Sequence, residues 1–113
     1  MNPKFKVIPV ASFLRELKSL SKKYVSIKED VNALVQQIKT DPEIGVSIGK
    51  DCYKIRLAIK SKGKGKSGGA RVITYVKIVQ STVYLLSIYD KADLENISDA
   101  QLKVRLNEIS KTL

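Results

Sequence analysis

Basic side chains occupy alternate positions of a segment whose pattern predicts a β-strand. In residues 53–60, apolar side chains alternate with polar and basic ones, among them Lys54 and Arg56. One face of the predicted strand is therefore apolar and the other is cationic. We expect Arg71, at the start of the next strand, and Lys91, directly after the last strand, to lie on the same surface. Because like charges on neighbouring strands repel each other, their concentration favours a bound anion.

Arginine, lysine and tyrosine can support one reaction in particular, the cleavage of RNA by its own 2′-hydroxyl group. The enzyme must orient that hydroxyl in line with the adjacent phosphate and stabilise the extra negative charge of the transition state. Arginine suits the second task, because its guanidinium stays charged and binds phosphate through paired hydrogen bonds. A lysine crowded by other cations can have a lowered pKa and so exchange a proton.

The amino-acid composition argues against other kinds of catalytic site. The 113 residues include no histidine and a single cysteine, Cys52, which excludes an internal disulfide and the usual zinc sites. Without a histidine to activate it, Cys52 is expected to be a small, partly buried residue. No carboxylate pair or serine triad is evident. We therefore expect no metal and no cofactor.

The positive charge of the chain is concentrated in its middle quarter. The formal net charge is +10, and residues 50–77 hold nine basic side chains and one acidic side chain. Such a concentration favours a polyanionic partner, with nucleic acid the first candidate and an anionic membrane surface the second. The sequence has no apolar run of the roughly 20 residues that a membrane span needs, and no signal peptide pattern. We expect a cytoplasmic protein with no membrane partner.

Residues 61–70 form a loop of lysine, glycine and serine that contains a literal G-x-G-x-x-G motif at residues 63–68. Nucleotide binding through this motif requires a helix to follow, whereas a strand pattern follows here. The loop could be a solvated hairpin connection or, if extended, a mobile cationic arm. Its proximity to the cationic strand face favours contacts with RNA. The residues expected to make them are Lys60, Lys62, Lys64, Lys66, Ser67, Gly68 and Gly69.

The remaining patterns predict one α+β domain over residues 1–113, with the element order β-α-α-β-β-β-α. A strand over residues 4–10 precedes a helical hairpin, whose first helix is expected to have Ser12 as its N-cap. The second helix is expected to begin with a capping box of Ser26 and Glu29. Three antiparallel strands over residues 53–60, 71–79 and 82–89 complete a sheet of about four strands. A C-terminal helix follows from Ser98, with a capping box to Gln101.

Three motifs together resemble the RelE/ParE toxin superfamily. They are DCYKIRL at residues 51–57, KSGGARVI at residues 66–73 and YLLSIYDK at residues 84–91. The last two are most similar to HigB-type members. The resemblance implies a RelE-like fold and a toxin of a type II toxin-antitoxin system that enters the ribosomal A site and cleaves the messenger RNA there. Its partners would be messenger RNA, ribosomal RNA and a cognate antitoxin, expected to be a HigA-like helix-turn-helix protein.

The resemblance also implies roles for five residues. Lys54 and Arg56 match the paired basic residues of the family, Arg71 matches its transition-state arginine, and Lys91 matches a basic residue after the last strand. Tyr89 is a weaker candidate for a general base or a stacking platform. The chain lacks the tyrosine that RelE-like members often carry in the C-terminal helix, and it lacks the histidines of some HigB members. The identity of the general base therefore stays open.

Two other functions remain as alternatives. A ParE-like DNA gyrase poison would share the fold but act by binding protein, and it has less need of the cations Lys54, Arg56 and Arg71. A non-enzymatic ribosome- or RNA-binding module would explain the charge but not the three motifs. We therefore favour a metal-independent endoribonuclease.

Overall fold

The computed structural model describes residues 4–112 except residues 64, 66 and 67. In this part of the chain a single sheet has the strand order β1-β5-β4-β3-β2. The first strand runs parallel to β5, and the other neighbouring pairs are antiparallel. The strands are β1 (Lys6–Pro9), β2 (Val46–Gly49), β3 (Cys52–Leu57), β4 (Ala70–Lys77) and β5 (Thr82–Asp90).

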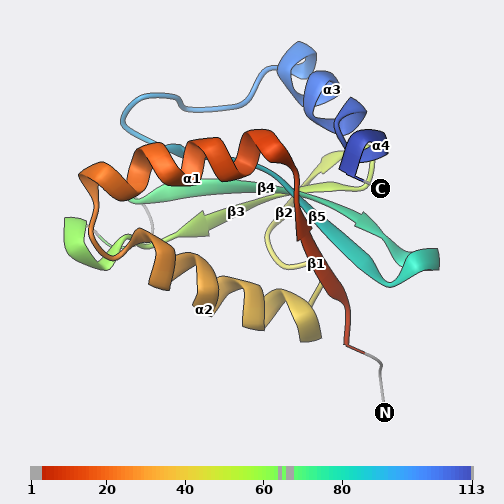
Figure 1. Ribbon diagram of the computed structural model, residues 1–113, viewed down its shortest axis with the longest axis horizontal. Coiled ribbons are helices and arrows are strands. Elements are labelled where there is room, and N and C mark those ends of the chain that lie inside the picture. Colours follow the sequence, from red (N-terminus) through yellow and green to blue (C-terminus); the bar gives the residue numbers. More distant parts are fainter. Residues whose placement is uncertain (1–3, 64, 66–67, 113) are drawn as a thin grey trace.

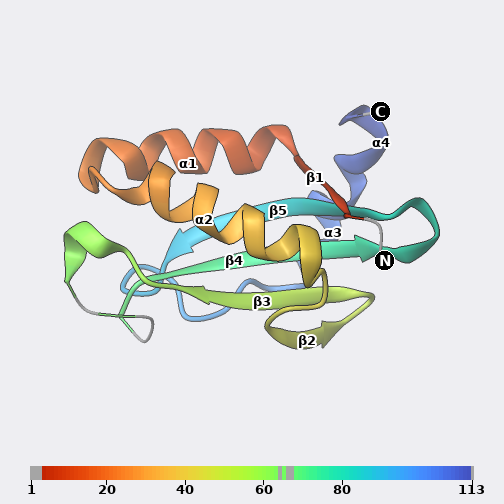
Figure 2. The same cartoon turned by 90° about the horizontal axis from the view of Figure 1, so that it is seen from below.

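Helices lie on both sides of this sheet. In Figure 1, α2 (Ile27–Thr40) lies below the strands and the segment 91–98 with α3 (Asp99–Asn107) lies above them, while α1 (Ala11–Lys23) crosses in front. Figure 2 shows α1 and α2 together along the sheet, with the segment 91–98 passing behind β3 and β4. A short α4 (Ile109–Thr112) follows α3. Within the described residues, no helix has the length and apolar composition needed to cross a lipid bilayer.

The main core forms between the helical hairpin and one face of the sheet. Ile55, Val72 and Ile88 are direct cross-strand partners and are at most 3% exposed. Phe13 of α1 and Ile38 of α2 belong to the same buried cluster. The alternation that the sequence shows in β3 thus decides which face of the sheet is covered by α1 and α2, and it leaves the cationic residues on the other face.

The predicted α+β class is confirmed, with a helical hairpin, a mainly antiparallel sheet and a C-terminal helical region. The sheet has five strands in place of about four, because β2 forms in a segment expected to be a connection. Three of its four residues are exposed, so the sequence shows no apolar alternation there. Lys50 and Asp51, with φ of 56° and 61°, adopt the left-handed conformation that closes the turn into β3.

Three strands are also shorter than expected, and the first of them, β1, covers Lys6–Pro9 in place of residues 4–10. Strand β3 ends at Leu57, since a short 3-10 helix, η1 (Lys60–Lys62), follows it. Strand β4 ends at Lys77, and a second 3-10 helix, η2 (Ile78–Gln80), precedes the turn into β5.

Of the three expected helix caps, the structure confirms one. The Ser98 hydroxyl accepts a hydrogen bond from the Gln101 N–H at 3.1 Å, as expected for the N-cap of α3. Ser12 is not an N-cap, because α1 begins at Ala11. The carboxylate of Glu108, 96 residues away, accepts hydrogen bonds from the backbone N–H and the hydroxyl of Ser12. This contact ties the C-terminal region to the start of α1.

The expected capping box of Ser26 and Glu29 is also wrong. The Ser26 hydroxyl makes no cap hydrogen bond to α2, and it donates instead to Asp30 and accepts from the Ser61 N–H. Since Asp30 also accepts from the Lys60 N–H, the start of α2 binds the 3-10 helix η1. The physical reason is that η1 presents unpaired backbone donors to the same two side chains.

A β-bulge interrupts β5 at Leu86, which has no partner in the register between Leu85–Thr74 and Ser87–Ile73. The backbone around it lies at the sheet edge that β1 does not reach. There the Leu86 carbonyl accepts from Arg105, and Glu16 accepts from the Ile88 N–H and from Arg105 at 3.0 Å. A partly buried ion pair thus supplies hydrogen bonds to an edge that none of the described strands covers. The bulge also changes which residues of β5 share a face.

Candidate active site on the cationic face of the sheet

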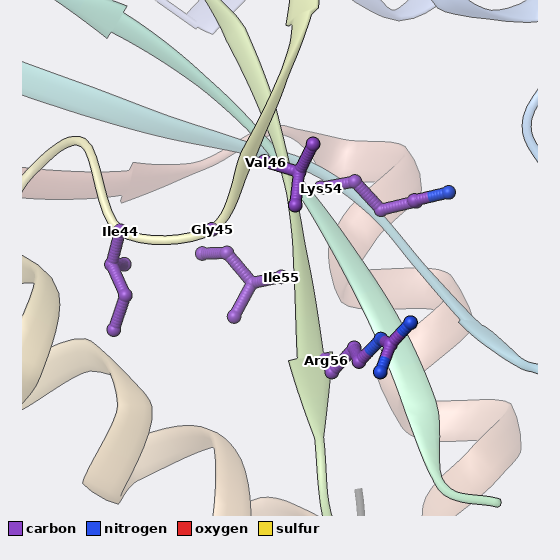
Figure 3. Close-up of a pocket in the computed structure, with 6 residues that line it drawn as sticks. All are labelled: Ile44, Gly45, Val46, Lys54, Ile55 and Arg56. Atoms are coloured by element: carbon purple, nitrogen blue, oxygen red, sulfur yellow. The ribbon is translucent and has the colours of Figure 1, made fainter. Parts of the chain in front are cut away.

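Three predicted site residues form a row across the sheet. Arg56 of β3 is the direct partner of Arg71 of β4, which in turn is the direct partner of Tyr89 of β5. Cross-strand partners lie on the same face, with Cα atoms about 4.5–5.5 Å apart. Lys54, two residues before Arg56 in β3, lies on the same face and pairs with Ile73 of β4. In Figure 3 the side chains of Lys54 and Arg56 extend to the same side of β3, away from Ile55. We call Lys54, Arg56, Arg71 and Tyr89 the cationic row.

The members of the cationic row differ in their exposure. Arg56 is exposed and Lys54 is half-buried, with its Nζ atom donating to Asn96 Oδ1 at 2.7 Å. Arg71 is only 3% exposed, and its Nη1 atom donates to the carbonyl of Ala70 at 3.1 Å. Two arginines on directly paired positions repel each other. The arrangement is therefore electrostatically suited to receive an anion, with Arg56 as the accessible contact.

Tyr89 lies in the row as a buried residue, 8% exposed, and the backbone of Ile97 lies next to its hydroxyl. Burial raises the pKa of Tyr89, and a backbone hydrogen bond from Ile97 and the positive charge of Arg71 oppose only part of that increase. The phenol therefore keeps its proton at neutral pH. This geometry favours a hydrogen-bond donor over the expected general base, and a buried ring offers no platform for stacking in this conformation.

Lys91 lies outside the cationic row, at the adjacent end of the sheet. Its side chain is exposed, and its backbone N–H donates to the carbonyl of Gly69 at 3.1 Å. Gly69 packs so closely on β3 that a Cβ atom there would come within 2.1 Å of the Leu57 carbonyl oxygen. Gly69 is therefore buried for a structural reason, while Gly68 is half-buried.

The lysines expected to form a mobile cationic arm have different surroundings. Lys60 is exposed, whereas Lys62 forms an ion pair with Asp90, with 2.8 Å between its Nζ and the carboxylate oxygen. The Asp90 side chain is fully buried and that of Lys62 is 14% exposed. Lys62 also lies over the ring of Tyr24, 5.5 Å from its centroid. Lys62 is thus ion-paired within the fold, and its expected contact with RNA stays a prediction. Lys64, Lys66 and Ser67 lie outside the described residues.

Asp90 and Tyr24 are the residues that sequence reasoning missed. Burial alone would raise the pKa of Asp90, but hydrogen bonds from Lys62, Tyr24 and the Ala92 N–H outweigh it and lower the pKa to about 2. Lys62 and Asp90 are 28 positions apart in the sequence, so no local sequence pattern predicts their ion pair. It anchors the base of the glycine-lysine loop to the end of β5.

We expect Asp90→Asn to remove a stabilising contribution on the order of 1–2 kcal/mol at neutral pH. Because the pKa of Asp90 is lower in the folded state than its ordinary value of 3.8, the contribution is complete above about pH 4 and is lost as the pH falls towards 2. Urea unfolding should therefore separate wild type from Asp90→Asn at pH 7 and not at pH 2. Asp93→Asn, which changes an exposed carboxylate on the same segment, is the control. A separation that stays constant with pH contradicts the role of the ion pair.

Cys52 and clusters of acidic side chains are further groups that could support chemistry. Cys52 is completely buried, and burial raises the pKa of its thiol to about 11, so it carries no reactive thiolate. The described residues contain no group of three or more Asp, Glu, Cys or His side chains that could hold a metal ion. A surface groove of about 580 Å³ lies along β3 beside the start of β2, with Lys54 and Arg56 in its lining (Figure 3).

The combination of a small, mainly antiparallel sheet, an N-terminal helical hairpin and a cationic row defines a RelE-like α+β protein. The model of the family described as the RelE toxin of the RelE/RelB toxin-antitoxin system matches residues 12–113. The chain therefore belongs to the RelE toxin family.

Solved structures agree with this fold. A double arginine-to-alanine mutant of the E. coli RelE toxin in the free state matches with a TM-score of 0.62 and 17% identity, over 94% of this chain and 98% of that one. The isolated E. coli RelE toxin gives 0.60 and 18%, over 91% and 97%. The intact E. coli RelBE toxin-antitoxin complex gives 0.58 and 19%, over 76% and 95%. At these identities the similarity establishes the fold alone.

Proposed function

We propose that this chain is a ribosome-dependent endoribonuclease that cleaves messenger RNA in the ribosomal A site and so inhibits translation. The observation that carries the proposal is the cross-strand row Arg56–Arg71–Tyr89, with Lys54 beside it. A protein that acts only by binding another protein has no need of two directly paired arginines. A site for a phosphate in its transition state does, since two guanidinium groups can stabilise the added charge.

The reaction uses the nucleophile that RNA itself supplies. The 2′-hydroxyl loses its proton to solvent and its oxygen forms a bond to the adjacent phosphorus, while the bond from phosphorus to the 5′-oxygen breaks. The leaving 5′-oxygen takes up a proton, which yields a 2′,3′-cyclic phosphate and a 5′-hydroxyl end. Arg56 and Arg71 stabilise the phosphorane charge, and Lys54 adds a further cation. Tyr89, which holds its proton, donates a hydrogen bond to the leaving oxygen. Arg71 and Tyr89 are buried here, so binding of RNA must include a local opening above them.

The surrounding cations bind RNA without reading its sequence. Lys91 and Lys60 are exposed next to the site, and with the loop residues they are suited to contact ribosomal RNA phosphates. We place the protein in the cytoplasm, where ribosomes are. Its antitoxin is a helix-turn-helix protein of the HigA-like type, which neutralises it by covering the cationic row.

Lys60→Gln and Lys62→Gln remove the same charge from neighbouring positions and should have different effects. Lys60→Gln is expected to lower the log–log salt slope of ribosome binding by about 0.7–0.9, the value for one lost phosphate contact. Lys62→Gln should leave the slope unchanged and reduce stability instead, because its charge is paired with Asp90. Binding titrations at several salt concentrations and urea unfolding measure both quantities. Equal slopes for the two variants would mean that Lys60 is merely solvated.

The proposed function is tested by induced expression followed by mapping of transcript 5′ ends. New ends should appear within minutes inside translated regions and in frame with codons. An untranslated transcript in the same cells is the control and should stay intact. Growth inhibition with intact transcripts and damaged DNA would indicate a gyrase poison instead. Intact transcripts without damaged DNA would leave only a non-enzymatic binding module.

A further inference from the structure

Residues 91–97 cross the cationic row between the end of β5 and the start of α3. They form turns and bends, and in Figure 2 they pass behind β3 and β4. The Lys54 Nζ atom of the row donates to Asn96 Oδ1 at 2.7 Å. The backbone of Ile97 lies next to the Tyr89 hydroxyl, so the segment lies on the same face of the sheet as the row. We call residues 91–97 the strap.

Both ends of the strap are fixed to the fold. At its start, the Asp90 carbonyl accepts from the Leu94 N–H at 3.2 Å, and the Asp90 carboxylate accepts from the Ala92 N–H at 3.0 Å. The ion pair with Lys62 holds Asp90 itself. At the other end, the hydroxyl of Ser98 caps α3. Movement of the strap is therefore confined to its middle, between these two ends.

The middle of the strap is held weakly. Six of its seven residues are exposed, and only Ile97 is half-buried. A segment with few buried contacts opens locally at a small part of the free energy of global unfolding. The hydrogen bond between Lys54 and Asn96 is itself exposed to solvent, so a stronger acceptor can replace the amide. The strap can therefore open while the sheet stays folded.

The closed strap is incompatible with the chemistry proposed for the row. Arg71 is 3% exposed and Tyr89 is 8% exposed, and the charge of Lys54 is directed to Asn96. A phosphate must reach these groups for the reaction to take place. Because a phosphate oxygen is charged and the Asn96 oxygen is neutral, the phosphate forms the stronger hydrogen bond with Lys54. RNA thus binds the open form better than the closed form and shifts the population towards it.

We propose that the strap is an autoinhibitory device, in which Asn96 holds Lys54 and keeps the cationic row covered until an RNA phosphate displaces the amide. The inference rests on the proposed function, which it deepens by naming how the site is regulated. The free protein is mostly closed, and its apparent affinity for RNA is reduced by the fraction of molecules that are open. Asn96 is thus the residue that sets how readily the site opens.

Two substitutions of Asn96 should have opposite effects on cleavage of a stalled ribosome complex. Asn96→Ala removes the acceptor and should lower KM by about fivefold, the size expected for one exposed hydrogen bond, with kcat unchanged. Asn96→Asp offers Lys54 a charged acceptor and should raise KM by about fivefold. Initial rates over a range of complex concentrations give both constants. A merely structural role for Asn96 predicts no fall of KM in Asn96→Ala.

Two controls isolate the contact between Asn96 and Lys54. Leu94→Ala shortens an exposed side chain of the same strap and should change KM by less than about twofold. Ser98→Asp adds the same charge as Asn96→Asp two residues further along and keeps a favourable helix N-cap. It should leave KM close to that of wild type. A rise in Ser98→Asp equal to that in Asn96→Asp would assign the effect to charge alone and contradict the proposal.

Hydrogen exchange of the free protein tests the strap without catalysis. The N–H of Ile97, which lies against Tyr89, should exchange about fivefold faster in Asn96→Ala than in wild type and more slowly in Asn96→Asp, after correction for intrinsic rates. If wild type cleaves no ribosome-bound message, the proposed function fails, and these exchange rates still decide on the strap. If exchange is equal in the three proteins, or KM does not fall in Asn96→Ala, the strap is wrong and the ribonuclease assignment stands.

Discussion

Replacement of Arg56 or Arg71 by alanine is expected to lower the rate of messenger RNA cleavage on the ribosome by about 10²–10³-fold. The two guanidinium groups are paired across β3 and β4 on the face that also carries Tyr89. Each contributes a charge that is already in place when the phosphate becomes more negative. Losing either group removes a contact that is strongest in the transition state, so the loss should appear mainly in kcat.

Two controls separate this catalytic effect from a loss of charge or of folding. Lys28→Ala removes an exposed cation on α2, away from the cationic row, and should cleave at close to the wild-type rate. Arg71→Lys keeps the charge at a buried position, where alanine would leave a cavity, and it should remain slow because lysine lacks the paired donors. Urea unfolding of each variant reports its stability. Wild-type rates in both alanine variants would remove the arginines from the active site.

Free messenger RNA is expected to be cleaved at least about 10³-fold more slowly than the same message on the ribosome, because orientation alone can supply roughly 7–11 kcal/mol. The cationic row contains no histidine or carboxylate, and the pKa of Tyr89 is raised above the ordinary value of 10, so Tyr89 is not an effective base near pH 7. In-line geometry imposed by the ribosome must then supply much of the rate.

The experiment follows cleavage of one message over time, either free or in a stalled initiation complex at the same protein concentration. A message stalled with the A site filled by transfer RNA is the control and should be protected. Equal rates for free and bound message would show that the protein holds a complete active site of its own.

The pairing of the cationic row was partly predictable from the sequence. Alternation in residues 53–60 correctly placed Lys54 and Arg56 on one face of β3, and Arg71 follows from the hairpin that joins β3 to β4. Tyr89 could not be placed in the same way, because the bulge at Leu86 reverses the alternation within β5. Without that extra residue, Tyr89 would lie on the opposite face.

The contacts that could not be predicted from the sequence join segments that are far apart along the chain. Lys62 looks like the other loop lysines, yet the buried carboxylate of Asp90 requires a partner and binds it. Ser12 looks like a helix cap, but a carboxylate from the C-terminal region takes its hydrogen bonds. A pocket of about 200 Å³ combines residues of β2, β3 and α3 with Asn96 and Ile97, and these residues form no motif along the chain.

The central claim is that the 2′-hydroxyl of ribosome-bound messenger RNA is the nucleophile and that the cationic row stabilises its attack. One measurement tests this most directly: the purified protein is added to two stalled complexes whose messages differ by a single 2′-deoxy nucleotide at the mapped cut. We predict that the all-ribose message is cut within the A-site codon and yields a 5′-hydroxyl end, whereas the deoxy message stays intact. Cleavage of both messages at the same rate, or of neither, would contradict the account.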